Sequence, residues 1–142
     1  MLNIFIDSDI ILDLLTKRDP YYIHAAKLFT LIDQNKIQAH TSPIVYANLH
    51  YLLKKLTSPD FALQSLRKLK NLVKVLSVDE KVINQALNSD FKDFEDAIQY
   101  YTAINNEMKF FITRNISDYQ KSQIPVCTAE EYLKIRHAQH EL

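Results

Sequence analysis

Short apolar runs alternate along the chain with stretches in which apolar residues recur every three to four positions, and these two patterns separate strands from helices. Leu2 to Ile6 is typical of a short buried strand, and the run from Ile10 to Leu15 predicts a helix. Ser42 followed by Pro43 predicts a helix start, because Ser caps free N–H groups and Pro has none to satisfy. The elements expected in the first half are strand 2–6, helix 10–15, helix 23–35, strand 38–41 and helix 43–56.

The same alternation continues in the second half. Ser58, Pro59 and Asp60 open a helix, and residues 72–78 are rich in β-branched side chains, which favours a strand. The elements expected here are helix 59–69, strand 72–78, helix 79–87, helix 93–104, strand 110–113, a short strand 125–127 and helix 129–140.

Strands that alternate with helices favour a parallel sheet covered on both faces. The sequence contains neither an internal repeat nor a linker. We therefore predict one α/β domain over residues 1–142, with three α/β/α layers and a mainly parallel central sheet of four to five strands. Ligands bind beyond the carboxyl ends of such strands, so polar residues directly after strands are the first candidates for a site.

The amino-acid composition excludes some classes of function and limits how the protein could bind RNA. The 142 residues are 47% hydrophobic and 24% charged, which is typical of a folded globular protein. The formal net charge is zero, so any RNA site must depend on local basic groups or on a metal ion. The chain has no Gly, which excludes the glycine-dependent phosphate loops of P-loop and dinucleotide-binding proteins.

Cellular location is indicated by Cys127 and by the N-terminal segment. Cys127 is the only cysteine, which excludes an intramolecular disulfide and favours a reducing compartment. Asp7 and Asp9 interrupt the apolar stretch 1–11, and no basic segment precedes it, so we expect neither a signal peptide nor a membrane span. The protein is predicted to be cytoplasmic.

Two clusters of acidic residues lie at the starts of predicted helices. Asp7, Ser8 and Asp9 follow the first strand; one carboxylate could cap the next helix, but two acids exceed what a cap requires. The second cluster, at the start of a later helix, consists of Asp90, Asp93, Glu95 and Asp96, and the helix dipole alone could explain several of these acids. Asp93 and Asp96 share one face, however, and repel each other unless a cation lies between them.

A third cluster follows the strand 110–113. Its members are Thr113, Arg114, Asn115 and Asp118. Taken alone these are ordinary turn residues whose side chains can bond the nearby backbone. Asn48 lies inside the helix that begins at Pro43, where Asn is a poor helix former, so it is either a satisfied polar residue beside the core or part of the same site.

All three clusters are assigned to one rim of the predicted sheet. Crowded carboxylates repel one another and have raised pKa values unless a cation neutralises them. Mg²⁺, or Mn²⁺ in its place, prefers oxygen ligands of this kind and keeps several waters. The three clusters together therefore predict a divalent-metal site at this rim.

Five segments carry a recognisable pattern when they are taken in order. They are FIDSDIILDLL at 5–15, SPIVYANLHYLL at 42–53, DFEDAIQYYTA at 93–103, FFITRNISDY at 110–119 and IPVCTAEEYL at 124–133. With these segments the chain resembles the PIN-domain ribonucleases, particularly the VapC-like toxins of bacterial toxin–antitoxin pairs. The resemblance covers nearly the whole length, and it implies an RNA substrate, a homodimer, and an antitoxin that covers the site.

By this resemblance, Asp7, Asp96 and Asp118 match the metal-binding acids of the family. The implied reaction is metal-dependent hydrolysis of RNA phosphodiester bonds. Two positions depart from the common pattern, because Asn48 stands where many members carry Glu and Asn115 stands where many carry Asp. An amide does not neutralise a cation, so we expect weaker metal binding, with at most one ion held tightly in the free protein.

The remaining site residues are assigned supporting roles. We expect Asn115, Asn48 and Ser8 to position water or phosphate, and Thr113 and Arg114 to complete the substrate-binding set. Further candidates are Asp9 and Asp93 near the metal, and Lys54, Lys55 and Lys92 for the RNA backbone.

Two other functions compete with this interpretation. The DSD motif at 7–9 with Thr113 resembles haloacid-dehalogenase-type phosphatases, but those need a lysine and an acidic pair after the threonine. Here only 29 residues follow Thr113, and they contain Lys121 and the helical Glu130 and Glu131. The alternative of a different class is a non-catalytic PIN-like module that binds RNA or protein. In this alternative, Asn48 and Asn115 replace acids because catalytic activity has been lost.

Overall fold

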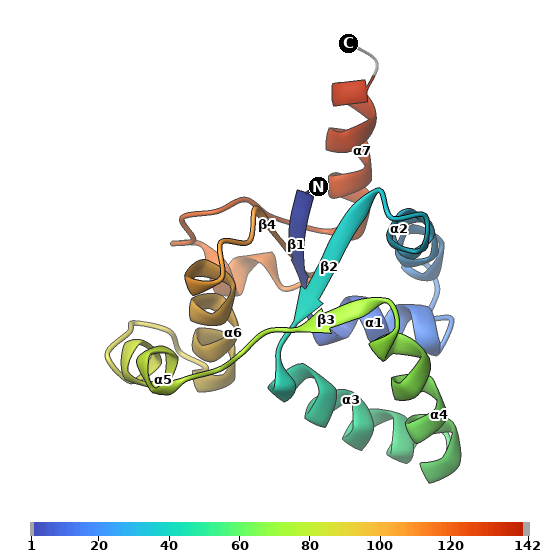
Figure 1. Cartoon of the computed structure of the whole chain (residues 1–142), viewed down its shortest axis with the longest axis horizontal. Coiled ribbons are helices and arrows are strands. Elements are labelled where there is room, and N and C mark those ends of the chain that lie inside the picture. The colour runs from blue at the N-terminus through green and yellow to red at the C-terminus, as the bar shows by residue number, and fades with distance from the viewer. Residues whose placement is uncertain (1, 141–142) are drawn as a thin grey trace.

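The computed structural model describes residues 2–140 and places a five-stranded sheet among seven helices (Figure 1). The ends of the predicted domain, residue 1 and residues 141–142, lie outside the described residues. The strands are β1 (Leu2–Ile6), β2 (Ile37–Thr41), β3 (Val73–Val75), β4 (Phe110–Ile112) and β5 (Val126–Cys127). The seven α-helices are α1 (Ser8–Leu15), α2 (Tyr22–Asp33), α3 (Pro43–Leu56), α4 (Pro59–Lys70), α5 (Glu80–Leu87), α6 (Phe94–Asn105) and α7 (Ala129–His140), and a 3₁₀ helix, η1 (Ile116–Tyr119), lies between β4 and β5.

The strands pair in the order β3-β2-β1-β4-β5, and every pair is parallel. The central strand β1 is paired on both edges, with Ile4 opposite Ala39 of β2 and Phe110 of β4. Its inner residues are fully buried, which explains why β1 is an apolar run and shows no alternation. The predicted parallel sheet is confirmed, with five strands.

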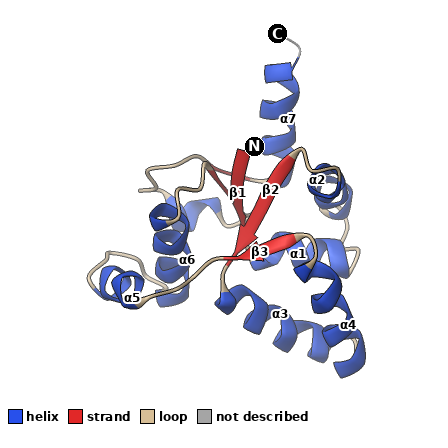
Figure 2. Ribbon diagram, viewed as in Figure 1, coloured by secondary structure: helices blue, strands red, loops and turns tan. Residues whose placement is uncertain are grey.

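Helices cover both faces of the sheet, which confirms the predicted three-layer α/β/α architecture. α5 and α6 lie on one side and α1, α2 and α7 on the other, while α3 continues beyond the carboxyl end of β2 and α4 packs beside α3 and leads into β3 (Figures 1 and 2). The main core joins the sheet to α1, α2 and α3, and its rings Phe5 and Phe111 stack at 4.8 Å between centroids. A smaller core of Val82, Ala86, Ala97 and Ile98 joins α5 to α6.

The predicted helix starts are largely confirmed by cap hydrogen bonds. The Ser42 hydroxyl accepts a hydrogen bond from the Val45 N–H, and Asp79 and Asp93 cap α5 and α6 in the same way. The first helix begins earlier than expected, at Ser8, because Asp7 itself is the N-cap. α2 ends before Asn35, whose φ of 58° lies in the left-handed region and stops the helix.

The strand expected at 72–78 is wrong in length, because only Val73–Val75 pairs with β2. The reason is geometric: β2 ends at Thr41, whose carbonyl accepts the last hydrogen bond from Leu76 N–H at 2.8 Å. Beyond that point the segment has no neighbouring strand in the sheet. None of the helices among residues 2–140 combines the length and apolar character needed to cross a membrane.

Candidate functional site

Asp7 lies where β1 meets α1, and its carboxylate is held from two directions. Its Oδ1 accepts a hydrogen bond of 2.7 Å from the Ser8 backbone N–H, which caps α1. Its Oδ2 accepts one of 3.0 Å from the hydroxyl of Thr113, which directly follows β4. Only 7% of Asp7 is exposed, so a charged group is held at the edge of the core.

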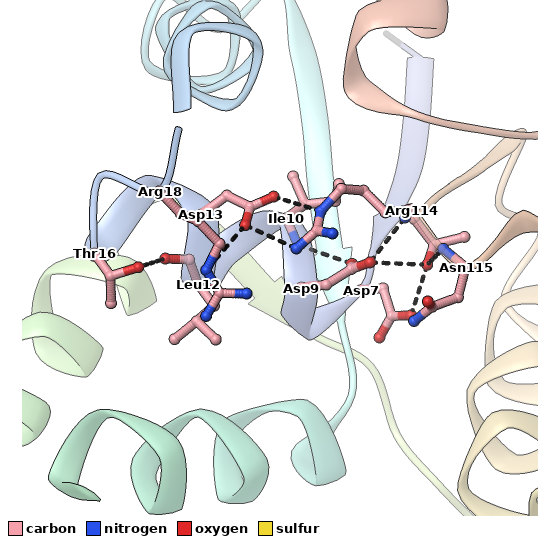
Figure 3. Close-up of polar contacts among 10 residues, drawn as sticks. Asp7, Asp9, Ile10, Leu12, Asp13, Thr16, Arg18, Arg114 and Asn115 are labelled. Atoms are coloured by element: carbon pink, nitrogen blue, oxygen red, sulfur yellow. Dashed lines mark hydrogen bonds and ion pairs between the residues drawn. The ribbon is translucent and has the colours of Figure 1, made fainter. Parts of the chain in front are cut away.

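Asp9 and Arg114 extend this network across α1 (Figure 3). The Arg114 backbone N–H donates to Asp9 Oδ2 at 2.8 Å. The Arg114 guanidinium donates to both carboxylate oxygens of the buried Asp13, at 2.8 and 3.0 Å, and lies 3.9 Å from the centre of the Tyr21 ring. The side chain expected to contact substrate is therefore bound to Asp13, and it is the backbone of Arg114 that contacts the acidic cluster.

Asp96 enters the site from the first turn of α6. The Asp96 backbone N–H donates a hydrogen bond to the Asp93 carboxylate, which caps α6. The Oδ1 of Asp96 accepts a hydrogen bond of 3.2 Å from the Tyr119 hydroxyl. Tyr119 is buried, and its ring lies 4.4 Å from that of Phe111. Burial raises the pKa of Tyr119, so its hydroxyl remains a neutral donor whose position is set by the core.

Asn115 and Asp118 lie together around η1, at the carboxyl end of β4. The Asn115 backbone N–H donates to the Thr113 hydroxyl at 3.1 Å, and its carbonyl accepts from the Asp118 N–H at 3.1 Å. Both side chains are exposed. They border the same site as Asp7 but face solvent.

Asn48 joins α3 to an acid of α6. Its side-chain N–H donates to the Glu95 carboxylate at 3.2 Å. The buried Ser42 hydroxyl donates to the Gln99 side-chain oxygen, which also joins the start of α3 to α6. Ser8, the remaining predicted position, has its hydroxyl 3.5 Å from Asp7 Oδ1.

The acids interact electrostatically. Burial raises the pKa of Asp7 to about 7, and the charges of Asp9 and Asp96 add to the shift. Burial also raises the pKa of Asp96 to about 6, with further increases from the charges of Asp93 and Asp118. Because Asp96 acts on Asp7 and Asp118 acts on Asp96, the three acids predicted to be close in space share one electrostatic environment.

This donor set suits a hard divalent cation. The ligands available are carboxylate and amide oxygens, which Mg²⁺ and Mn²⁺ prefer, and a cation would relieve the repulsion that raises the pKa values. Among residues 2–140, however, no three Asp, Glu, His or Cys side chains are already arranged as a metal centre. The donors therefore fit such an ion in their chemistry, although their spacing is not that of a preformed centre.

Three contacting residues were given no role in the predicted site, although Glu95 belongs to the second acidic cluster. Asp13 holds the Arg114 guanidinium, Tyr119 holds Asp96, and Glu95 contacts Asn48. Each stands close in sequence to a predicted residue: Asp13 is one helical turn after Asp9, Tyr119 follows Asp118, and Glu95 precedes Asp96. That proximity was the available signal, but their partners are distant in sequence.

The chain is similar to several characterised proteins. It is 24% identical to Ribonuclease VapC1 of Aquifex aeolicus (strain VF5) over 135 residues, which cover 92% of each chain. A toxin-antitoxin complex from Klebsiella pneumoniae contains a chain of similar structure, with a TM-score of 0.66, 22% identity, and coverage of 88% of this chain and 96% of that one. For VapC20 of Mycobacterium tuberculosis, a sarcin-ricin-loop-cleaving toxin, the TM-score is 0.61 at 19% identity, with coverage of 76% and 86%.

A family model gives the broadest assignment. The model described as PIN domain matches residues 3–117, which include every predicted site residue except Asp118. The five sequence segments had predicted this assignment. Since the match spans most of the chain, the protein belongs to the PIN domain family.

Proposed function

We propose that this protein is a divalent-metal-dependent endoribonuclease, a VapC-like toxin that acts in the cytoplasm as a single domain over residues 1–142. The observation that carries the proposal is the buried Asp7 carboxylate, whose pKa of about 7 reflects burial and the neighbouring charges of Asp9 and Asp96. A folded protein gains nothing in stability from such a group, which is typical of a site kept for function. The similarity to a ribonuclease, which covers 92% of each chain, supports RNA as the substrate.

In this proposal Asp7, Asp96 and Asp118 hold one Mg²⁺ or Mn²⁺ ion. A bound ion of this kind activates water for attack on the phosphorus atom and neutralises the charge that develops on the phosphate oxygens. Thr113 and Tyr119 do not contact the ion in this proposal. Their hydroxyls donate hydrogen bonds to Asp7 and Asp96 and so fix the orientations of these two ligands.

The other predicted residues take roles that follow from their contacts. Thr113 is buried, so we assign it to orienting Asp7 and not to contacting phosphate. Arg114 fixes Asp9 through its backbone N–H, and its guanidinium anchors the 113–115 turn to α1. The exposed Asn115 amide and the Ser8 hydroxyl remain the groups placed to orient water or phosphate, and Asn48 positions Glu95.

We also propose an antitoxin protein and a second copy of this chain as partners. The similarity to a chain of the Klebsiella pneumoniae toxin-antitoxin complex supports the first. An antitoxin suited to this site would place a cationic side chain among Asp7, Asp96 and Asp118, where it would relieve the same repulsion as a metal ion. Expression of the chain alone should then arrest growth, and co-expression of the antitoxin should restore it.

A non-catalytic RNA- or protein-binding module is the second candidate, and one observation favours it. No three acidic, His or Cys side chains within residues 2–140 form a ready metal centre. Calorimetry with Mn²⁺ separates the two candidates, since a module without a metal site shows no binding that depends on Asp7.

The decisive experiment is cleavage of structured RNA by purified protein in the presence of Mg²⁺ or Mn²⁺. We expect the wild type to cut and the variants Asp7→Asn and Asp96→Asn to lose most of that activity. Asp33→Asn is the matched control, because Asp33 is an exposed acid at the end of α2. Equal cleavage by all four proteins, or cleavage that persists in EDTA, contradicts the proposed function.

A further inference from the structure

An open groove of about 910 Å³ continues from the acidic site along α6. One end is formed by Asp96 and Asp118, two of the proposed metal ligands. Asp96, Tyr100 and Ile104 follow one another at intervals of four residues, so one face of α6 forms the length of the groove. The groove and the proposed cleavage site are therefore one continuous surface.

Aromatic rings line this groove. Phe91 and Tyr101 are half-buried and both contribute to its wall. The Phe91 ring is held by three neighbours, with centroid distances of 5.4 Å to Tyr100, 6.2 Å to Tyr101 and 5.9 Å to Tyr119. Since the ring is already fixed in position, a planar ligand can stack on its exposed part without having to order it.

Amide side chains surround the rings. Gln85, Gln120 and Gln123 line the groove. The Gln85 oxygen accepts a hydrogen bond of 2.7 Å from the Asn105 amide, whereas the amides of the exposed Gln120 and of Gln123 can both donate and accept, as recognition of a base edge requires. The backbone N–H of Gln123 donates to the Tyr100 hydroxyl at 2.9 Å. This bond fixes the 120–123 segment against α6 and so sets the shape of the groove.

Two lysines supply positive charge in a groove that is otherwise acidic. Lys92 and Lys121 both line it, and both are exposed. Lys121 lies 3.6 Å from Asp90, but the two side chains are 86% and 88% exposed, so this ion pair is weak and a phosphate can replace the carboxylate. The lysines flank the groove on two different segments, as contacts to two phosphates of one strand require.

From these features we infer that the groove binds one unpaired nucleobase of the RNA, next to the phosphate that is cut. The base stacks against Phe91 and Tyr101, an amide reads its edge, and Lys92 and Lys121 contact the flanking phosphates. The volume lies within the range of roughly 300–1,000 Å³ that is typical of small-ligand sites. The inference rests on the proposed ribonuclease function and adds a subsite that selects the base beside the cut, which only an unpaired base can enter.

A hairpin RNA with a randomised loop tests this inference. Wild-type protein with Mn²⁺ should cut in the loop, and sequencing of the products should show a base preference at one position beside the cut. Phe91→Leu should flatten that preference, whereas Phe91→Tyr, which keeps the ring, should retain it. A merely structural role of Phe91 would change the rate without changing the preference.

An abasic substitution then measures the stacking. Removing the base at the preferred position should lower kcat/KM of the wild type at least about fivefold, the effect of losing one stacked base. Phe91→Leu should cleave the intact and abasic RNAs at equal rates. If the abasic penalty and the base preference are the same in Phe91→Leu and in the wild type, the subsite is refuted while the ribonuclease function stands. No cleavage of any RNA by the wild type refutes the function itself.

A second set of variants covers the case in which Phe91→Leu fails to fold. Lys92→Gln and Lys121→Gln change exposed side chains and should each raise KM without altering kcat, while Lys68→Gln, an exposed lysine on α4, should not. An unchanged KM in both groove variants contradicts the inference. A change in self-association or antitoxin binding in these variants, with RNA cleavage unaffected, also overturns it and assigns the groove to a protein partner.

Discussion

Replacing Asp7 with Asn should stabilise the metal-free protein while it removes the proposed activity. Burial, together with the charge of Asp9, raises the pKa of Asp7 from 3.8 to about 7 in the folded protein. A carboxyl group with a raised folded-state pKa binds protons more tightly when folded, so stability falls as pH rises from about 4 to about 7. Asparagine cannot ionise and removes this cost, and it is as good an N-cap for α1 as aspartate.

The size of the effect follows from the same pKa. Each pKa unit corresponds to about 1.4 kcal/mol, so the raised pKa of Asp7 lowers the free energy of unfolding by about 4 kcal/mol at pH 8 and by about 2 kcal/mol at pH 5. The amide NH₂ of Asn replaces the oxygen that accepts from Thr113, a loss of about 1–2 kcal/mol. The expected net gain is therefore about 2 kcal/mol at pH 8 and close to zero at pH 5.

Thermal unfolding in EDTA, followed by circular dichroism at both pH values, measures this gain. At pH 8 the Tm of Asp7→Asn should exceed that of the wild type by roughly 8 °C, at about 4 °C per kcal/mol for a domain of this size. Mn²⁺ should then raise the Tm of the wild type and leave that of the variant unchanged. Asp33→Asn should match the wild type throughout. A variant less stable than the wild type at pH 8, or an equal gain at both pH values, refutes the reasoning.

Three further variants test the contacts around the acids. Arg114→Met should lower the free energy of unfolding, measured in urea, by about 3 kcal/mol, because it leaves the buried Asp13 carboxylate without its bidentate partner. This loss of stability should be smaller when Asp13→Asn is present in the same protein. Tyr119→Phe should lower kcat about threefold to tenfold in single-turnover cleavage with little change in Tm, since only the hydrogen bond to Asp96 is lost. Asn115→Asp should tighten Mn²⁺ binding about tenfold by calorimetry.

The order of the elements was predictable because each follows from a local pattern. β1 is apolar except for Asn3 because both of its edges and both of its faces are covered, and Ser42 with Pro43 forms the predicted cap of α3. The extent of β3 was not predictable in the same way. Its sequence favours a strand up to residue 78, but a strand persists only beside a partner, and β2 ends at Thr41.

The candidate residues were predictable in identity but not in their contacts. Asp7 and Asp96 were selected because they follow a strand or begin a helix, and the structure places both in one electrostatic environment. The role of Arg114 depends on Asp13, which lies 101 positions away in sequence, and no local pattern relates the two residues. The hydrogen bond from Tyr119 to Asp96 likewise exists only because η1 packs beside α6 in the folded chain.

The two parts of the acidic site are held in different ways, and the difference explains why its metal centre is not preformed. Asp7 and Asp96 have fixed orientations, because buried hydroxyl groups of Thr113 and Tyr119 donate to them. Asp118 and Asn115 are exposed around η1, where their side chains can turn toward a ligand without disturbing the core. The fixed acids already repel, so bringing the Asp118 carboxylate closer is unfavourable until a cation compensates the added charge. In the proposed reaction, RNA phosphate would supply further oxygen ligands to such a cation and so complete an arrangement that the protein leaves open.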